Sequence, residues 1–135
     1  MDVVFTPYNS YGCIKFGASR NEIRSAIGIY KEFKKSPFSK NTTDDFGGFH
    51  VYYSDDNYVE AIEVFSGEIK FNDEIMFPTT LSVFTKIMNT FDSEIMKKND
   101  HIISRALGCC ASVNEGTIDG IILCSKDYFQ RLLNI

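Results

Sequence analysis

The sequence predicts an α+β fold in which antiparallel β-hairpins pack with about three helices. Residues 48–66 and 108–125 each hold two apolar runs on either side of a polar turn, which is a hairpin pattern. Residues 19–27 and 81–91 repeat apolar side chains at helical spacing. A chain of 135 residues with 44% apolar and 24% charged side chains is typical of one globular domain, so we predict a single domain over residues 1–135.

The first elements are short strands. Residues 3–6 and 13–16 are apolar enough to predict two strands, with a loop from Pro7 to Gly12 between them. Gly17 then interrupts the strand pattern and separates it from the first helix.

The first predicted helix spans residues 19–27. Ser19 and Glu22 form a capping box, in which each side chain satisfies a backbone N–H at the helix start. Gly28 either ends this helix or lies within it. The apolar face at i, i+3, i+4 and i+7 comprises Ile23, Ala26, Ile27 and Tyr30.

The middle of the chain predicts a connection followed by the first hairpin. Residues 31–45 are polar, contain Pro37, and are expected to form a mobile connection. Strands are predicted at 49–53 and 58–65, and a third at 68–71, before Pro78 ends the sheet.

The second half predicts a helix, a linker, a hairpin and a last helix. Either Thr79 or Thr80 caps the second helix. Residues 92–101 are predicted to be a polar linker, and a short helix is expected to begin near Lys126. The side chains of the second helix that are expected to point inward are Leu81, Phe84, Ile87, Met88 and Phe91.

The two hairpins can be aligned with one gap in the turn. Gly48 then meets Gly108, Val59 meets Ile118, Glu60 meets Asp119, and Ile62 meets Ile121. Because a helix and a polar linker precede each hairpin, the alignment predicts a duplicated helix–linker–hairpin unit over residues 17–77 and 79–133. The alternative is a chance likeness between two amphipathic hairpins.

Negative charge is concentrated in one segment. The whole chain has a net charge of −4, but residues 41–77 hold nine carboxylates and one base, Lys70. We expect several of these acids to converge on one sheet edge and its loops. Such a surface would repel nucleic acid and attract a basic protein. The alternatives are a solvated face that only aids solubility, or a site for a hard cation.

No assembled catalytic motif is present in the sequence. The four cysteines lack metal-clamp spacing and are expected to be buried free thiols, because we recognise no secretory signal. His50 and His101 are far apart, and Asp55-Asp56 lacks the spacing of a calcium loop. We therefore expect no catalytic residue, metal or cofactor, and a cytoplasmic location without a membrane partner. A basic–aromatic cluster around Phe33 is weak evidence for RNA contact.

The chain resembles a family of small bacterial immunity proteins from polymorphic toxin and contact-dependent growth-inhibition systems. The resemblance lies in the layout of IKFGASRNEIRSAIG, TDDFGGFHVYYSDDNYVEAIEVF and LGCCASVNEGTIDGIILCSKDYF. The first of these segments also resembles small envelope lipoproteins of the outer-membrane-assembly type, but their signal and lipidation cysteine are missing here.

The immunity-protein resemblance implies a cytosolic, non-enzymatic inhibitor that binds one cognate toxin domain, often a basic nuclease. The acidic segment supplies the candidate toxin-facing residues, with tyrosines as aromatic anchors. The runner-up is a small enzyme or ligand-binding protein with a pocket between helix and sheet, and a third possibility is an unrelated adaptor. The candidate residues are Asp44, Asp45, Tyr52, Tyr53, Asp55, Asp56, Tyr58, Glu60, Glu68, Asp73 and Glu74.

Overall fold

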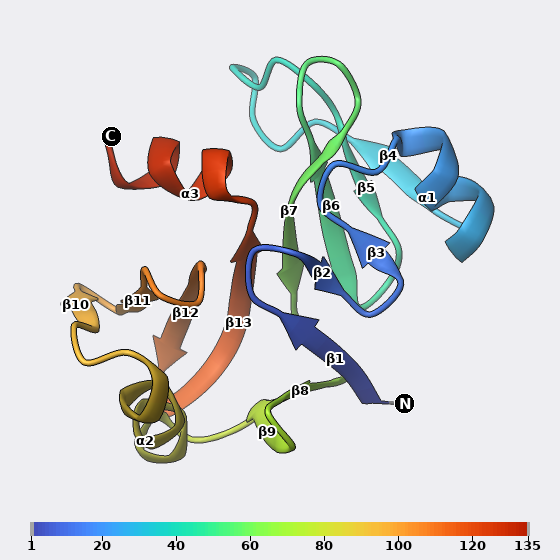
Figure 1. Ribbon diagram of the computed structural model, residues 1–135. Coiled ribbons are helices and arrows are strands. Elements are labelled where there is room, and N and C mark those ends of the chain that lie inside the picture. The colour runs from blue at the N-terminus through green and yellow to red at the C-terminus, as the bar shows by residue number, and fades with distance from the viewer. Residues whose placement is uncertain (1, 135) are drawn as a thin grey trace.

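The computed structural model describes residues 2–134 and confirms the α+β fold class. These residues form three helices and thirteen strands, arranged in two sheets that are mostly antiparallel (Figure 1). None of the described helices has both the length and the apolar character needed to cross a membrane.

The smaller sheet has five strands in the order β3-β2-β1-β8-β9. β1 and β8 pair in parallel, and the other neighbours are antiparallel. The strands predicted at 3–6, 13–16 and 68–71 are present, but β2 lies in the predicted loop and β9 was not predicted. Asn72 and Asp73 form the β8–β9 turn with φ of 52° and 64°, values that Asn and Asp tolerate. The bounds are β1 Asp2–Thr6, β2 Ser10–Tyr11, β3 Ile14–Lys15, β8 Glu68–Phe71 and β9 Glu74–Phe77.

The larger sheet has eight strands in the order β10-β11-β12-β13-β7-β6-β5-β4, and every neighbouring pair is antiparallel. Both predicted hairpins are confirmed, as β6–β7 and β12–β13. The bounds are β4 Lys31–Phe33, β5 Thr43–Asp45, β6 Phe49–Tyr53, β7 Val59–Val64, β10 Met96–Lys98, β11 His101–Ser104, β12 Cys109–Asn114 and β13 Thr117–Cys124.

Two polar segments that were predicted to be connections contain strands, so those predictions are wrong. Residues 31–45 hold β4 and β5, and residues 92–101 hold β10 and the start of β11. These strands have three or four residues and little apolar alternation, so local pattern does not mark them. Pairing with the rest of the sheet gives their backbone groups hydrogen-bond partners.

The helices begin where the caps predict. Ser19, Thr80 and Ser125 are the N-caps, and each accepts a hydrogen bond from a backbone N–H in the first turn. Gly28 ends α1 with φ of 98°. In α2 the buried side chains are those of Phe84, Ile87 and Met88, and Leu81 is half-buried. Phe91 is exposed, so the prediction that it points inward is wrong. The helices are α1 Arg20–Ile27, α2 Leu81–Phe91 and α3 Lys126–Leu133.

The predicted apolar face of α1 is only partly correct. Ile23 is buried and Ile27 is half-buried against the core, but Ala26 and Tyr30 are exposed. Arg20 is buried instead, and its side chain crosses to the sheet. The face of α1 that meets the sheet is therefore rotated toward a charged side chain, which a count of apolar residues does not reveal.

The two hairpins share their strand register. Val51 pairs with Ile62 as Ala111 pairs with Ile121, in accord with the sequence alignment. Each hairpin has a β-bulge at the same place, and the unpaired bulge residue is an acid in both, Glu60 and Asp119. Where the hairpins meet, β7 pairs with β13 around a central pair, Glu63 and Ile122, that the alignment also matches. This register gives the sheet an approximate two-fold symmetry about that pair.

The correspondence extends to the helix starts. The N–H of Arg20 donates to the carbonyl of Asn57 at 2.8 Å, and that of Leu81 donates to Gly116 at 2.9 Å. In the larger sheet each helix is followed by four strands, β4–β7 after α1 and β10–β13 after α2, rather than by a linker and a hairpin. The duplicated units 17–77 and 79–133 stay a prediction, and they also contain β8 and β9 in the first and α3 in the second.

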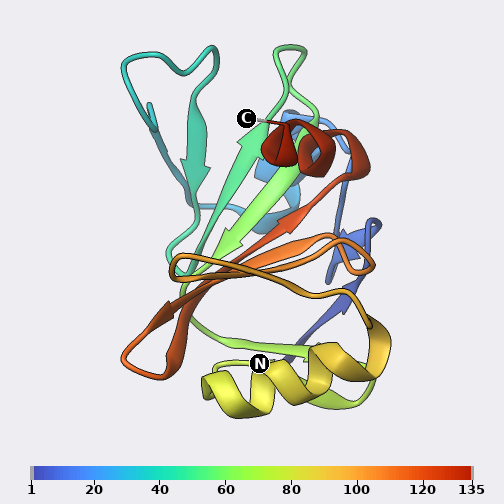
Figure 2. The same ribbon diagram turned by 90° about the vertical axis from the view of Figure 1, so that its left-hand side faces the viewer.

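The eight-stranded sheet has an inner and an outer face. A single cluster of buried apolar side chains joins the inner face to α1, α2 and the five-stranded sheet. α3 lies on the outer face, where Tyr128 is next to Tyr52 (ring centroids 6.3 Å apart), and Figure 2 shows it in front of the strands. Much of the outer face has no helix over it in this view, so its side chains are candidates for function.

Candidate functional site

One row of side chains crosses the whole outer face through neighbouring strands. The row is charged in the N-terminal unit and apolar in the C-terminal unit. Because paired residues in a sheet project to the same side, these eight side chains share one face. From edge to edge the row reads Lys31, Asp45, His50, Glu63, Ile122, Cys110, Ile103 and Met96.

Three residues in the charged half of this row and two phenylalanines beside it form a compact group that we call the acid–aromatic patch: Phe33, Asp45, His50, Glu63 and Phe65. The imidazole of His50 meets the Phe33 ring edge-on at 5.0 Å and the Phe65 ring at 4.8 Å. Its Nε2 lies 3.6 Å from Oδ1 of Asp45, and Glu63 is its partner on the other neighbouring strand. The imidazole of His50 thus contacts two aromatic rings and lies near one carboxylate, and Glu63 is its register partner on β7.

The patch is open to solvent but fixed in place. The side chains of Asp45 and His50 expose 33% and 24% of their surface, and Phe65 exposes 43%. All but Phe65 are on strands, and Phe65 directly follows β7, where its N–H donates to the carbonyl of Gly48 at 2.9 Å. A sheet that fixes these side chains lowers the entropy lost when they bind a partner.

Tyr52 connects the patch to α3. Its hydroxyl donates a hydrogen bond to Oε1 of Glu63, and Lys35 Nζ lies 4.2 Å above its ring. Burial, together with the bond to Glu63, raises the pKa of Tyr52 far above its usual value. Tyr52 is buried, so its hydroxyl fixes the Glu63 carboxylate, and its ring is not exposed to a partner.

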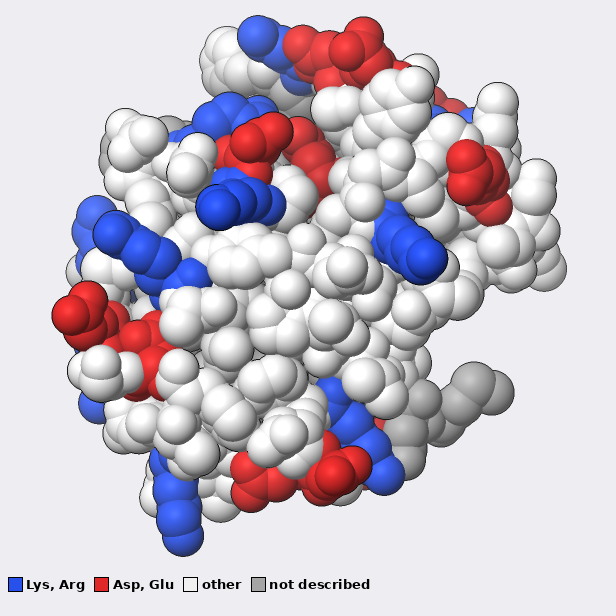
Figure 3. Space-filling view, in the orientation of Figure 1, with Lys and Arg blue, Asp and Glu red and all other residues white. Residues whose placement is uncertain are grey.

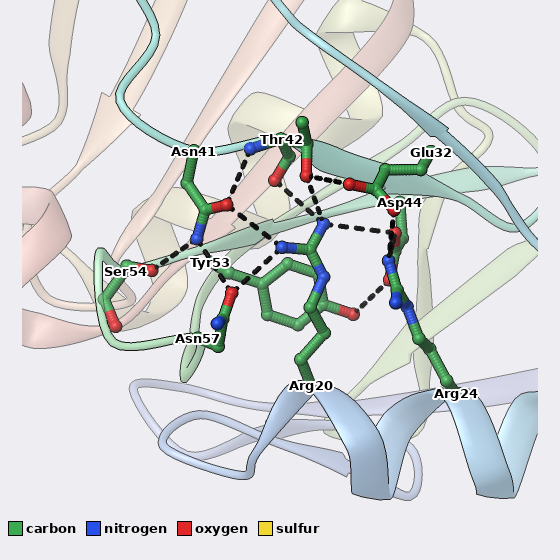
Figure 4. A network of polar contacts seen from close by, with 9 residues as sticks. All are labelled: Arg20, Arg24, Glu32, Asn41, Thr42, Asp44, Tyr53, Ser54 and Asn57. Carbon is green, nitrogen blue, oxygen red and sulfur yellow. Dashed lines mark hydrogen bonds and ion pairs between the residues drawn. The ribbon is translucent and has the colours of Figure 1, made fainter.

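Asp44 and Tyr53 belong to a buried polar network behind the patch (Figure 4). The guanidinium of Arg24 donates to both carboxylate oxygens of Asp44, at 2.8 and 2.7 Å, and Arg20 donates to Oδ1 at 3.2 Å. The Tyr53 hydroxyl donates to Oδ2 at 2.9 Å. Asp44 exposes none of its surface and Tyr53 only 4%, so neither side chain is placed to face a partner as the sequence suggested.

The same network lines a polar depression between α1 and the sheet, with a volume of about 440 Å³. It is the pocket between helix and sheet that the enzyme alternative needed. Its two arginines are already engaged, because Arg20 also donates to Asn41, Thr42 and Asn57, and Arg24 also donates to Glu32. The network therefore ties α1 to the sheet.

The two aspartates at the tip of the β6–β7 hairpin, Asp55 and Asp56, border different surface depressions. Asp55 borders one lined by Lys35, Tyr52 and Arg131, and Asp56 borders the one beside α1. Both are exposed, as is Tyr58 at 51%. Glu60 accepts a hydrogen bond from Arg131 of α3, so this carboxylate is already paired.

The remaining predicted residues lie elsewhere. Glu68, Asp73 and Glu74 belong to β8, β9 and their turn in the five-stranded sheet. The nine acids of residues 41–77 thus do not converge on one edge, because the chain leaves the larger sheet after β7. Figure 3 shows one face on which acidic and basic side chains lie side by side near the rim around an uncharged centre.

The aromatic members of the patch were missed by the sequence analysis. Phe33 lies in a segment that was predicted to be mobile, and Phe65 was treated as the end of a strand. The signal that could have found the patch is strand alternation: His50 projects to the face opposite Val51, and the residues in register with His50 on β7 and β5 share its face. Among residues 2–134, no group of three or more His, Cys, Asp or Glu side chains is arranged to hold a metal ion.

Comparison of the chain with protein-family models, with curated proteins and with solved structures returns no match.

Proposed function

We propose that this protein is a non-enzymatic, cytoplasmic immunity protein that binds and neutralises a cognate toxin domain through the acid–aromatic patch. The observation that carries the proposal is the position of His50 between Phe33 and Phe65 and between Asp45 and Glu63 on an open sheet face. Aromatic side chains next to carboxylates, held by rigid strands, suit a protein interface.

The composition of the acid–aromatic patch suits a basic partner protein. Asp45 and Glu63 would pair with the lysines or arginines that a nuclease uses to hold phosphate. Phe33 and Phe65 would exclude water around those pairs, which strengthens them. The exposed Asp55 and Asp56 would add long-range attraction during encounter, an effect that falls with added salt.

Affinity capture from the native host, followed by mass spectrometry, tests the proposal. The baits are the wild type, a patch variant (Asp45→Asn/Glu63→Gln) and a matched control (Glu68→Gln/Glu74→Gln) that removes two charges from the smaller sheet. We expect a basic protein on the wild-type and control baits but not on the patch bait, and less of it at high salt. Melting temperatures of the three baits establish that all are folded.

Neutralisation needs a second experiment. The captured protein is expressed in a host with the wild-type chain or the patch variant, and growth is measured. Rescue of growth by the wild type but not by the patch variant is the expected result. If all three baits capture the same proteins equally, or if the captured protein does not inhibit growth, the proposal is wrong.

A further inference from the structure

The apolar half of the outer-face row forms the floor of a groove that the proposed function does not use. Met96, Ile103, Cys110 and Ile122 are consecutive partners across four strands, β10 to β13. Neighbouring strands are about 4.8 Å apart, so the floor runs for about 14 Å. The groove has a volume of about 690 Å³, within the usual range for small-ligand sites.

The two banks of the groove differ. Leu132 and Leu133 of α3 form an apolar wall on one side. On the other side, Lys98 and His101 are paired in the next row of the sheet, parallel to the floor. Lys97, Asn99 and Arg105 also line the groove, and among residues 2–134 no Asp or Glu side chain does. In a chain of net charge −4, this groove combines an apolar floor with a rim whose charged side chains are basic.

The basic groups are available for a ligand. Within residues 2–134, neither Lys97 nor Lys98 forms an ion pair with a carboxylate, and both are exposed. The floor side chains Met96, Ile103 and Ile122 are half-buried, so they keep surface that a ligand could cover. Covering apolar surface is favourable by about 25 cal/mol per Å².

We propose that this groove binds a single-chain anionic amphiphile of the fatty-acid class. The alkyl chain would lie along the four-strand floor against Leu132 and Leu133, and the carboxylate would meet the basic rim at Lys98. A hydrocarbon chain fits this floor better than a peptide does, because a peptide backbone has N–H and C=O groups that need partners and the floor side chains offer none. The proposal is independent of the proposed function.

Calorimetric titration of the purified protein with dodecanoate, below its critical micelle concentration and at pH 8, tests the proposal. We expect saturable binding with one ligand per chain. Dodecyl maltoside, which has the same chain without a charge, and acetate, which has the charge without the chain, should bind much more weakly or not at all. An acidic amphipathic peptide is titrated in parallel, and binding of the peptide but not of dodecanoate would refute the fatty-acid assignment.

Variants place the ligand in the groove. Lys98→Glu should weaken dodecanoate binding by about tenfold or more, through loss of a charge-assisted contact and added repulsion. Leu132→Ala should weaken it several-fold through lost apolar contact. Lys34→Glu, an equal charge change on an exposed lysine outside the groove, is the matched control and should bind like the wild type.

Backbone amide chemical shifts of the wild-type protein locate the ligand without relying on variants that could fail to fold. Dodecanoate added to the wild type should shift the amides of residues 96–105, 122 and 132–133. Shifts confined to another surface, absence of saturable binding, or equal binding by the wild type and Lys98→Glu would each overturn the proposal.

Discussion

Arg20 and Asp44 form an ion pair in which both side chains are almost completely removed from solvent. Arg20 Nη2 lies 3.2 Å from Oδ1 of Asp44, and the two side chains expose 9% and 0% of their surface. Arg24 and Tyr53 donate to the same carboxylate, so one acid on β5 holds two arginines of α1 and a tyrosine of β6. Breaking such a pair by removing one partner is costly, because the other charge stays buried.

Asp44→Ala should therefore destabilise the protein by ~3–5 kcal/mol, measured by urea denaturation. Its neighbour provides the control. Asp45 is one-third exposed and hydrogen-bonds the N–H of Gly47, so Asp45→Ala should cost only about 1 kcal/mol. Equal losses for the two variants would show that the Asp44 network is not a stabilising feature.

Stability should fall in acid, and Asp44 should account for part of the fall. Burial alone would raise the pKa of Asp44, but hydrogen bonds from Arg24, Arg20 and Tyr53 outweigh it and lower the pKa below 3.8. The pKa of Asp92 is likewise lowered, because bonds from Glu94, Ser104 and Ala106 outweigh its burial.

A folded-state pKa below the unfolded one gives stability that is complete above the unfolded value and is lost as pH falls through the folded value. Urea unfolding between pH 7 and about 2.5 should show this loss of stability. The free energy of unfolding should change less with pH in Asp44→Asn than in the wild type. An identical slope in wild type and variant would assign the acid sensitivity to other groups.

Thiol reactivity should distinguish one cysteine from three. Cys13 is exposed, whereas Cys109, Cys110 and Cys124 are buried. Burial raises the pKa of all three buried thiols, that of Cys124 to about 12, so little thiolate is present at pH 8. Ellman's reagent should titrate one thiol in the native protein and four in denaturant, and Cys13→Ser should leave none reactive before unfolding.

Two glycines that both adopt a left-handed backbone conformation should differ in how much stability the protein loses when each is replaced by alanine. Gly108 and Gly116 both have left-handed φ, 66° and 79°. A Cβ at Gly108 would lie 2.5 Å from the ring of Tyr8, while a Cβ at Gly116 meets nothing within 4 Å. Tyr8 cannot easily move, because its hydroxyl donates to the carbonyl of Arg105 and its ring packs on Phe129.

Both alanine variants should lose about 1 kcal/mol from the left-handed backbone. Gly108→Ala should lose a further ~1–3 kcal/mol from the clash, seen as a lower urea midpoint. If Gly116→Ala is as unstable as Gly108→Ala, the contact with Tyr8 is unimportant.

The first helix offers a graded test of its buried face. Ile23 is 3% exposed and belongs to the core, so Ile23→Ala should cost ~2–5 kcal/mol. Ile27 is half-buried, so Ile27→Ala should destabilise the protein clearly less than Ile23→Ala. Ser19→Ala should destabilise it by ~1 kcal/mol through the lost cap. Thermal melts in which Ile27→Ala is the worst of the three would contradict this packing.

The sequence was sufficient for elements that carry their own pattern. The helix caps at Ser19 and Thr80 and the two hairpins follow from residues that lie close together in the chain. β4, β5 and β10 have three residues each and form only because a neighbouring strand is present, so a local reading treated them as linkers.

The candidate site was harder to predict for the same reason. Asp44 reads as a solvated acid in a polar segment, and only the two arginines of α1, twenty and twenty-four residues earlier, show that it is buried. The acid–aromatic patch needs β4 in place to bring Phe33 to His50. By contrast, Asp55 and Asp56 were correctly placed at a turn, because turn chemistry is local.

The pairing of β7 with β13 also affects how the sheet ends. Two units that join by adding strand to strand could in principle go on adding copies and grow into a fibre, because each end of the sheet offers unpaired backbone groups. Here the terminal strands β4 and β10 are only three residues long and carry Lys31, Lys97 and Lys98. Short edge strands that carry charged side chains disfavour the addition of a further strand, so the eight-stranded sheet ends at β4 and β10.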